Sequence, residues 1–305
     1  MAWFRFRRRP QRPKNLILDA PDATYETFVG KRHIKGMPYM LPKDISEIKR
    51  LDFQQFLLRY GLQANFLAPL RNPLSILDVG CGTGRWAVEL ALQFPQANVI
   101  GTDIIPTESF TLGYGVDAAP DNYLFVKGNV LERLPFEDHS FDFVHQRLLI
   151  TAIPLTQWPH VIAELVRVTR PGGWVELQEC GVPIDAPGQP YPALWQTWID
   201  FCRTRGVDFT LGNRIGAMLQ QGQLMNIQQR EVIFPMGNYG GRVGTMSATD
   251  CLAVGGTMKG AVVAANLMSS EQYDRLYDAT KAEFQRPVSQ AMLPFYIAYG
   301  QKAAV

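Results

Sequence analysis

The sequence is short of the features that mark secreted, metal-binding or membrane-spanning proteins. Its 305 residues include only four cysteines, and none belongs to a C-x-x-C pair, so neither a disulfide framework nor a zinc knuckle is expected. No apolar run approaches the roughly 18 residues of a membrane helix. No apolar segment long enough for a signal peptide follows the first arginines. We therefore expect a cytoplasmic protein without a metal centre and without a membrane partner.

Basic and acidic residues are nearly balanced in number, except at the amino terminus. The net charge is only +2, yet the first fourteen residues carry six basic side chains and no acid, so the rest of the chain is mildly acidic. These basic residues are Arg5, Arg7, Arg8, Arg9, Arg12 and Lys14. Such an arm can contact nucleic acid, but chain termini are often unstructured and solvated. We do not expect nucleic acid as the partner, and a monomer or homodimer suits the remaining composition.

Strand and helix signals alternate through the middle of the chain. The predicted strands are 75–79, 98–102, 123–127, 141–145 and 174–178, and the predicted helices between them are 85–94 and 160–169. A further helix follows Asp44, the expected N-cap, with Glu47 completing a capping box. Alternation of this kind predicts βαβ units, a parallel sheet and helices on both of its faces. Residues 41–182 are therefore expected to form one core, preceded by an arm and loops over 1–40.

The pattern changes after this core. Helices are expected over 191–201, 211–220, 248–267 and 271–284, and strands over 227–234 and 295–299, with a Gly-rich stretch at 237–244. Residues 183–305 would then be a helical acceptor cap interleaved with the last strands of the sheet. Trp195, Trp198 and Phe201 have helical spacing, which fits either a packed core or a substrate cage.

The chemistry centres on the segment 76–87, where three glycines alternate after a buried strand. Gly80, Gly82 and Gly84 allow a sharp turn and a close approach of the backbone to a ligand. The following helix offers unpaired amide groups at the same place. Residues 82–87 also fit the dinucleotide fingerprint G-x-G-x-x-A, so the glycines alone do not distinguish the cofactors.

Two acidic residues flank this turn. Asp78 precedes the first glycine by two residues, where its charge would repel a pyrophosphate but attract an ammonium or a sulfonium group. Asp103 ends the next strand, where a carboxylate can accept both hydroxyls of a ribose. Asp78 therefore favours S-adenosylmethionine over NAD, whereas Asp103 suits both.

At this point the chain resembles the class I S-adenosylmethionine-dependent methyltransferases. Five blocks carry the resemblance in order: LDVGCGTGRWA at 77–87, IGTD at 100–103, GNV at 128–130, SFDFVHQR at 140–147 and LVRVTRPGGWVELQE at 165–179. The flanking runs at 41–58 and 296–302 are similar to a subgroup of LaeA-like and UbiE-like small-molecule methyltransferases. The resemblance implies a Rossmann-like α/β fold with a seven-stranded, mostly parallel sheet and an antiparallel C-terminal hairpin. Methyl transfer from a sulfonium is an in-line displacement, and the apolar run at 261–264 together with the aromatic helix favours a small, apolar or aromatic metabolite as the acceptor.

The resemblance assigns roles to particular residues. The cofactor-binding residues that it implies are Tyr39, Arg50, Asp78, Gly80, Cys81, Gly82, Gly84, Asp103, Ile104, Asn129, Val130, Gln146 and Arg147. Among them, Asp78 and the glycines would surround the methionine half, Tyr39 and Arg50 would reach its carboxylate, and Ile104, Asn129 and Val130 would meet the adenine. His145, Gln146 and Arg147 end the fourth strand, where the transferred methyl group should point.

Two further side chains are candidates for catalysis, each with an alternative. His145 can act as a general base or be a buried histidine satisfied by a hydrogen bond, and Glu179 can be catalytic or merely solvated. Two other classes of protein also remain open. One is a cofactor-binding regulator that acts through protein partners, and the other is an NAD(P)-dependent oxidoreductase.

Overall fold

The computed structural model describes most of the chain. The described ranges are 25–28, 31–34, 45–104, 119–184 and 189–304. The basic arm, Tyr39 and the expected N-cap Asp44 lie outside them. Among the described residues, no helix is long and apolar enough to cross a bilayer.

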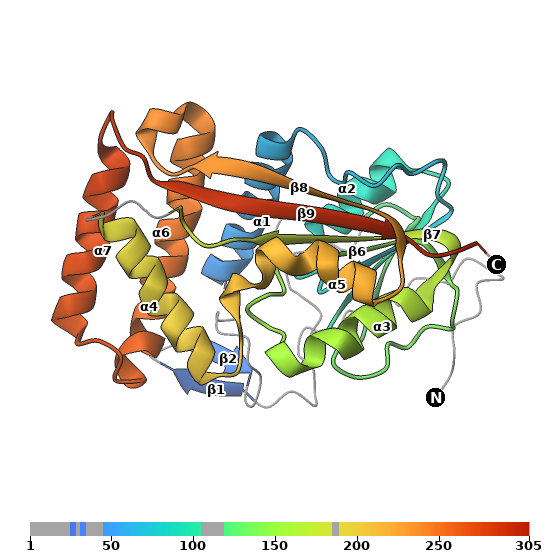
Figure 1. The fold of residues 1–305 in the computed structure, drawn as a ribbon, viewed down its shortest axis with the longest axis horizontal. Coiled ribbons are helices and arrows are strands. Elements are labelled where there is room, and N and C mark those ends of the chain that lie inside the picture. Colours follow the sequence, from blue (N-terminus) through green and yellow to red (C-terminus); the bar gives the residue numbers. More distant parts are fainter. Residues whose placement is uncertain (1–24, 29–30, 35–44, 105–118, 185–188, 305) are drawn as a thin grey trace.

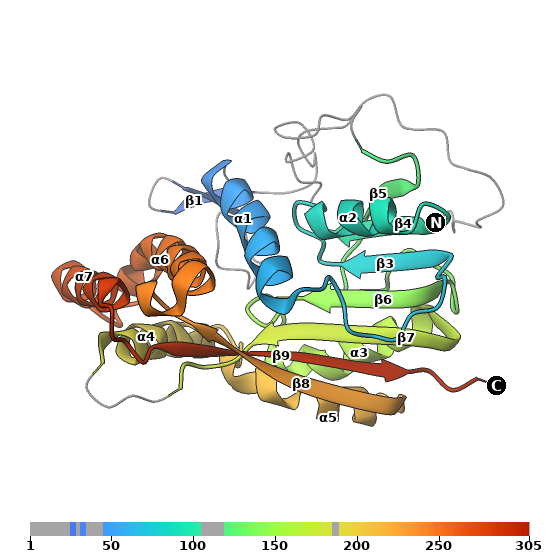
Figure 2. The same cartoon turned by 90° about the horizontal axis from the view of Figure 1, so that it is seen from above.

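A seven-stranded sheet forms the centre of the molecule, in the order β5-β4-β3-β6-β7-β9-β8 (Figures 1 and 2). Its strands are β3 (Ser75–Val79), β4 (Asn98–Asp103), β5 (Tyr123–Lys127), β6 (Phe141–Arg147), β7 (Thr169–Cys180), β8 (Met225–Pro235) and β9 (Met292–Gln301). The first five are parallel, whereas β9 runs antiparallel to both β7 and β8. The expected Rossmann-like sheet with an antiparallel C-terminal hairpin is thus confirmed.

Helices cover both faces of the sheet because its central strands are apolar on both sides. Ile76 packs with the buried face of α2 (Arg85–Gln93), whereas Leu77 packs on the opposite face with α3 (Trp158–Val168). That second face also receives α5 (Ile215–Gln221), which follows the 3₁₀ turn η4 (Phe209–Arg214). Runs without polar alternation are expected of strands that are buried on both faces.

A second group of helices lies beyond the carboxyl ends of the parallel strands (Figure 2). It comprises α1 (Ile45–Leu62), α4 (Pro190–Thr204), α6 (Gly241–Ala264) and α7 (Ser270–Gln285), with the short turns η3 (Leu155–Gln157) and η5 (Asn238–Gly240). Helix α1 contacts α6, and α4 and α6 both contact α7. A capping box of Ser269 and Gln272 starts α7. These helices therefore stand over the edge of the sheet at which ligands bind in open α/β folds.

Three expectations differ from the structure. An antiparallel hairpin, β1 (Tyr25–Phe28) with β2 (Lys31–Ile34), occupies part of the segment expected to be arm and loops. Strand β7 begins at Thr169, because Phe141 pairs with Thr169 and the next pair is Phe143 with Trp174, so the Pro-Gly-Gly sequence bulges within the strand.

Helix α6 also begins earlier than expected, at Gly241 instead of within 248–267. Its glycines serve close packing: a Cβ atom on Gly244 would lie 2.2 Å from the carbonyl oxygen of Gly237. The Gly-rich stretch at 237–244 thus overlaps the start of the helix, where glycine allows the first turn to approach the backbone that precedes it.

Candidate functional site

The glycine turn joins β3 to α2 at the carboxyl edge of the sheet. Gly80, Gly82 and Gly84 have φ angles of +68°, +54° and +72°, a left-handed conformation that favours glycine. The amide of Gly84 donates to the carbonyl oxygen of Cys81 (2.8 Å), which closes the turn before the helix starts. The predicted strand–turn–helix is therefore present. Gly80, Cys81 and Gly82 line a cavity of about 270 Å³, whereas Gly84 is not on its lining.

Asp78 lines this cavity and is held by the His145 ring, which in turn stacks on Trp86. His145, directly opposite it on β6, places Nδ1 2.8 Å from Asp78 Oδ1. The His145 ring stacks on Trp86, with centroids 3.8 Å apart and planes 6° apart. Burial lowers the pKa of His145, so the imidazole is neutral at pH 7, and Nδ1 must carry the hydrogen because the carboxylate can only accept. The Asp78 carboxyl group is thus held in a fixed orientation.

Neither predicted catalytic side chain reaches the cavity. Of the two interpretations of His145, the buried and hydrogen-bonded one agrees with the structure, whereas the general-base one does not, since His145 is 1% exposed and absent from the lining. Glu179 is fully buried and also off the lining, so it is not solvated. Its oxygens accept from the amides of Leu149 (3.0 Å) and Ile150 (3.2 Å).

The residues expected around the ribose and adenine do gather on the cavity wall. Asp103, Ile104, Asn129 and Val130 all line it. Asp103 Oδ2 accepts from the Gly82 amide (3.0 Å), so β4 and the glycine turn are joined directly. The Asn129 side chain caps its own turn, since Oδ1 accepts from the amide of the second residue after it (3.0 Å).

Gln146 lies outside the cavity lining. Its side chain is fully buried, and neither atom of its amide has a hydrogen-bond partner among the described residues. Successive side chains of β6 point to opposite faces of the sheet, so Gln146 points away from the face of His145, the residue that pairs with Asp78. The contact of Gln146 with the cofactor therefore stays a prediction that the cavity lining does not support.

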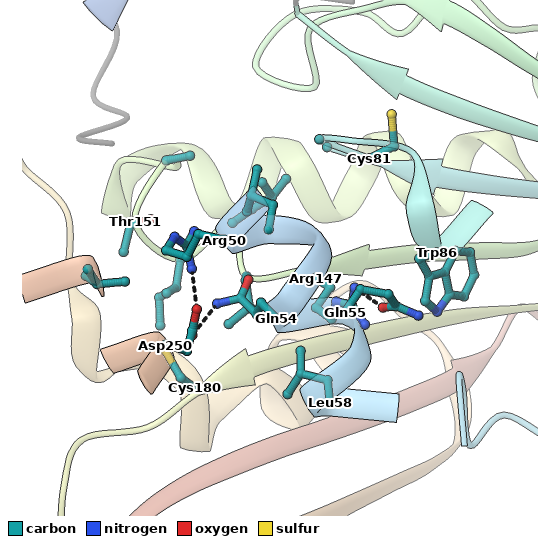
Figure 3. A pocket seen from close by; sticks show the side chains of 18 of the residues that line it. Arg50, Gln54, Gln55, Leu58, Cys81, Trp86, Arg147, Thr151, Cys180 and Asp250 are labelled. Atoms are coloured by element: carbon teal, nitrogen blue, oxygen red, sulfur yellow. Dashed lines mark hydrogen bonds and ion pairs between the residues drawn. The ribbon is translucent and has the colours of Figure 1, made fainter. Parts of the chain in front are cut away.

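Three arginines from the described part of the chain line the cavity: Arg85 pairs with Glu89 (3.2 Å), and the other two, Arg50 and Arg147, differ in how their charge is balanced (Figure 3). Arg50 of α1 holds Glu47 through two hydrogen bonds (2.8 and 2.7 Å) and Asp250 of α6 through a third (2.8 Å). Gln54 donates to the other oxygen of Asp250 (2.9 Å), which completes a bridge between α1 and α6 across the cavity. Two carboxylates therefore neutralise Arg50.

Arg147, in contrast, is paired with a neutral group. Its Nη2 atom donates to Gln55 Oε1 (2.5 Å), its only hydrogen bond within the described ranges. The Gln55 amide is itself held by Asn65 (3.0 Å) and Glu89 (2.9 Å). Burial lowers the pKa of Arg147, which nevertheless keeps its charge because guanidinium does not deprotonate in proteins. The cavity thus presents one cation that is suited to an anionic group of a ligand.

The far half of the cavity is an apolar chamber. Its lining comes from β7, α4, η4, β8, α6 and β9, and includes Cys180, Trp195, Trp198, Phe209, Phe234, Met236, Cys251, Val254, Met258, Leu293 and Phe295. Trp195 and Trp198 are thus both packed and cavity-lining, whereas Phe201 belongs to the core alone. The charged residue on this side, Asp250, is paired with Arg50. The chamber therefore suits a neutral, apolar or aromatic molecule.

Two buried glutamates on β7 were not predicted as such from the sequence. Glu176 was not singled out, and Glu179 was expected to be either catalytic or solvated. Glu176 accepts from the amides of Leu67 (2.8 Å) and Ala68 (2.7 Å), and Glu179 from those of Leu149 and Ile150. Burial raises the pKa of Glu176 to about 7 and that of Glu179 to about 8. The sequence gives no sign that these glutamates are buried and hydrogen-bonded, because the amides that donate to them lie far away along the chain.

These shifts predict how stability depends on pH. In the unfolded chain both carboxyls ionise near 4.5, so the folded state binds more protons above that value. Between about pH 6.5 and 8.5 the free energy of unfolding should fall as pH rises, by at most about 1.4 kcal/mol per pH unit for each group. The pKa of His145 is lowered by burial, so this residue makes the free energy of unfolding rise with pH, but only below the ordinary histidine pKa. Urea unfolding across this range tests the sign; a rise with pH would contradict it.

The fold and the glycine turn together define a Rossmann-like methyltransferase domain. Residues 76–173 match the family model described as a methyltransferase domain. A selenomethionine structure of a Haemonchus contortus phosphoethanolamine N-methyltransferase bound to S-adenosyl-L-methionine has the same fold, with a TM-score of 0.51 and 18% identity over 89% of this chain and 62% of that one. Residues 76–173 therefore carry a methyltransferase domain, and the fold is shared with a structure of an N-methyltransferase bound to S-adenosyl-L-methionine.

Several relatives in sequence are fungal proteins. Methyltransferase str2 of Strobilurus tenacellus is 34% identical over 48% of this chain and 50% of its own length. N-methyltransferase sirN of Leptosphaeria maculans is 29% identical over 73% of this chain and 80% of its own length. The secondary metabolism regulator laeA of Aspergillus fumigatus is 31% identical over 50% of this chain and 39% of its own length. The chain spans about half the length of the first of these relatives.

Proposed function

We propose that this protein binds S-adenosylmethionine at the glycine turn and transfers its methyl group to a small, apolar or aromatic metabolite in the adjoining chamber. The observation that carries this proposal is the continuity of the cavity. A single space of about 270 Å³ joins Gly80 and Asp103 to the aromatic chamber around Trp195 and Phe295. Cofactor and acceptor can therefore meet without crossing solvent.

The residues at the glycine turn fit the charges of the cofactor. Asp78 suits its ammonium and sulfonium groups, and Arg147, whose hydrogen bond goes to a neutral amide, suits its carboxylate. A Cβ atom on Gly82 would meet only Leu51 Cδ1, at 3.7 Å, so the turn leaves room on its cavity side. Asp103 would hold the ribose, with Ile104, Asn129 and Val130 at the adenine. Arg50 is less suited to the carboxylate than the sequence indicated, since Glu47 and Asp250 already hold it.

Bound S-adenosylmethionine would supply a methyl group on a sulfonium, which leaves as a neutral thioether. The protein then has to align the nucleophile and keep water out. The chamber walls do both, because they offer an apolar shape, and burial raises the pKa of the two thiols among them, Cys180 and Cys251, so that these remain protonated. The scarcity of charge there favours a neutral acceptor whose lone pair faces the turn. NAD(P) fits less well, since Asp78 would repel its pyrophosphate.

Transfer of a labelled methyl group tests this function. The full chain is incubated with S-adenosylmethionine carrying a tritiated methyl group and with a panel of neutral phenols, N-heterocycles and aliphatic alcohols. We expect label in an organic-soluble product of one class, with equimolar S-adenosylhomocysteine. Label found only in added protein or RNA would contradict the small-molecule acceptor. Cofactor binding without any product from fungal metabolite extracts would favour a regulatory role, as the similarity to laeA suggests.

A further inference from the structure

The segment that follows β6 is held by a buried carboxylate outside the cavity. Leu148 has a φ of +53°, an uncommon conformation for a branched side chain. Three successive amides from this point donate to β7: Leu148 to the Gln178 carbonyl oxygen (2.9 Å), Leu149 to Glu179 Oε1 (3.0 Å) and Ile150 to Glu179 Oε2 (3.2 Å). The surroundings therefore hold this segment in a conformation that it would not choose alone.

The same segment is a wall of the cavity. Residues 148–153 all belong to the lining. Within it, the side chain of Leu149 lies directly over the first glycine of the cofactor turn, since a Cβ atom on Gly80 would be 2.6 Å from Leu149 Cδ1. The position of Leu149 is thus matched to the glycine turn. A shift of the Leu149 backbone would move the side chain that closes this turn from the acceptor side.

The burial of Glu179 costs free energy, although the residue holds the segment that follows β6. A fully buried carboxyl group loses hydration that its hydrogen bonds only partly replace, and burial raises its pKa to about 8. Glu176, three residues earlier, provides a comparison, because it is equally buried and also accepts from two successive amides. Its donors, Leu67 and Ala68, are not on the cavity lining. The two glutamates are therefore alike in burial and in accepting two successive amides, although Glu176 takes both amides on Oε2 and accepts a further hydrogen bond from Gln178 on Oε1.

We propose that Glu179 is a positioning residue for the cofactor site: it fixes the amides of Leu149 and Ile150 and so sets Leu149 against Gly80. It does not touch a ligand itself. This inference rests on the proposed function, in that the glycine turn is taken to hold the methionine half of S-adenosylmethionine. It explains why a carboxylate stands where an apolar side chain would be cheaper to bury.

The test compares matched variants of the two glutamates in the full chain. Glu179→Leu removes both acceptors and Glu179→Gln keeps one, whereas Glu176→Gln makes the same change away from the cavity. We expect Glu179→Leu to raise the Kd for S-adenosylhomocysteine roughly three- to thirtyfold by calorimetry, and Glu179→Gln to recover part of this loss. Amide exchange at residues 149 and 150 should accelerate in parallel. Glu176→Gln should change the Kd by less than about twofold, even where it lowers stability.

Several outcomes would overturn the inference. One is an unchanged Kd in a folded Glu179→Leu protein; another is an equal loss in Glu176→Gln, which would indicate general destabilisation. If Glu179→Leu does not fold, Leu149→Ala serves instead, since it removes the contact with Gly80 and should weaken binding to a similar extent. An unchanged Kd in that variant would likewise contradict us. Failure of the wild-type protein to bind S-adenosylhomocysteine would instead refute the proposed function.

Discussion

Replacement of Asp78 by asparagine should weaken the binding of S-adenosylmethionine by roughly ten- to a hundredfold. The change removes a charge but keeps the shape, and asparagine Oδ1 can still accept from His145 Nδ1. Hydrogen bonds to charged groups contribute about 1.5–3 kcal/mol, and each 1.4 kcal/mol is a factor of about ten in Kd. Calorimetric titration of the variant with S-adenosylmethionine measures the loss directly.

Two comparisons make this result specific. Asp200→Asn removes an exposed carboxylate on α4 that pairs with Arg203, and it should leave the affinity unchanged. Arg147→Gln removes the opposite charge at the glycine turn and should also weaken binding, because the cofactor's carboxylate loses its cation. Wild-type affinity in both Asp78→Asn and Arg147→Gln would show that the zwitterion does not lie between these residues.

The largest loss of stability is expected from Trp86→Ala. Trp86 is 2% exposed, stacks on His145 and donates from Nε1 to the Asn65 carbonyl oxygen (2.8 Å). Truncation of a buried tryptophan costs about 3–5 kcal/mol, since both the packing and the cavity left behind count against the fold. It also removes the ring that holds His145, and through it Asp78, in place.

Urea unfolding measures this cost, with Trp174→Ala as the matched control. Trp174 is only half-buried and packs edge-on against Tyr299, so its loss should be clearly smaller. A decrease below about 1 kcal/mol for Trp86→Ala, or an equal decrease for both variants, would contradict the role given to the Trp86–His145 stack.

Local signals explain which parts of the site the sequence could predict. The glycine turn needs left-handed residues within a few positions, so its composition reveals it. Asp78 and Asp103 end adjacent strands and are fixed relative to that turn by sheet geometry alone. These residues were found because the chemistry and the spacing lie in one short stretch.

Long-range contacts account for what the sequence could not predict. Asp250 meets Arg50 from two hundred residues away, and Gln55 meets Arg147 across the sheet edge, with no shared pattern to link them. His145 and Glu179 were placed at strand ends correctly, yet the direction of each side chain depends on the neighbouring elements. Helical spacing likewise cannot tell that Trp195 lines a chamber whose opposite wall belongs to α6.

Titration of the full chain with S-adenosylmethionine and, separately, with NADH tests the central claim most directly. Our account predicts calorimetric binding of S-adenosylmethionine with one site per chain and no heat from NADH, because Asp78 attracts the sulfonium cofactor and repels a pyrophosphate. Binding of NADH alone would contradict the assignment of this cavity to a methyltransferase.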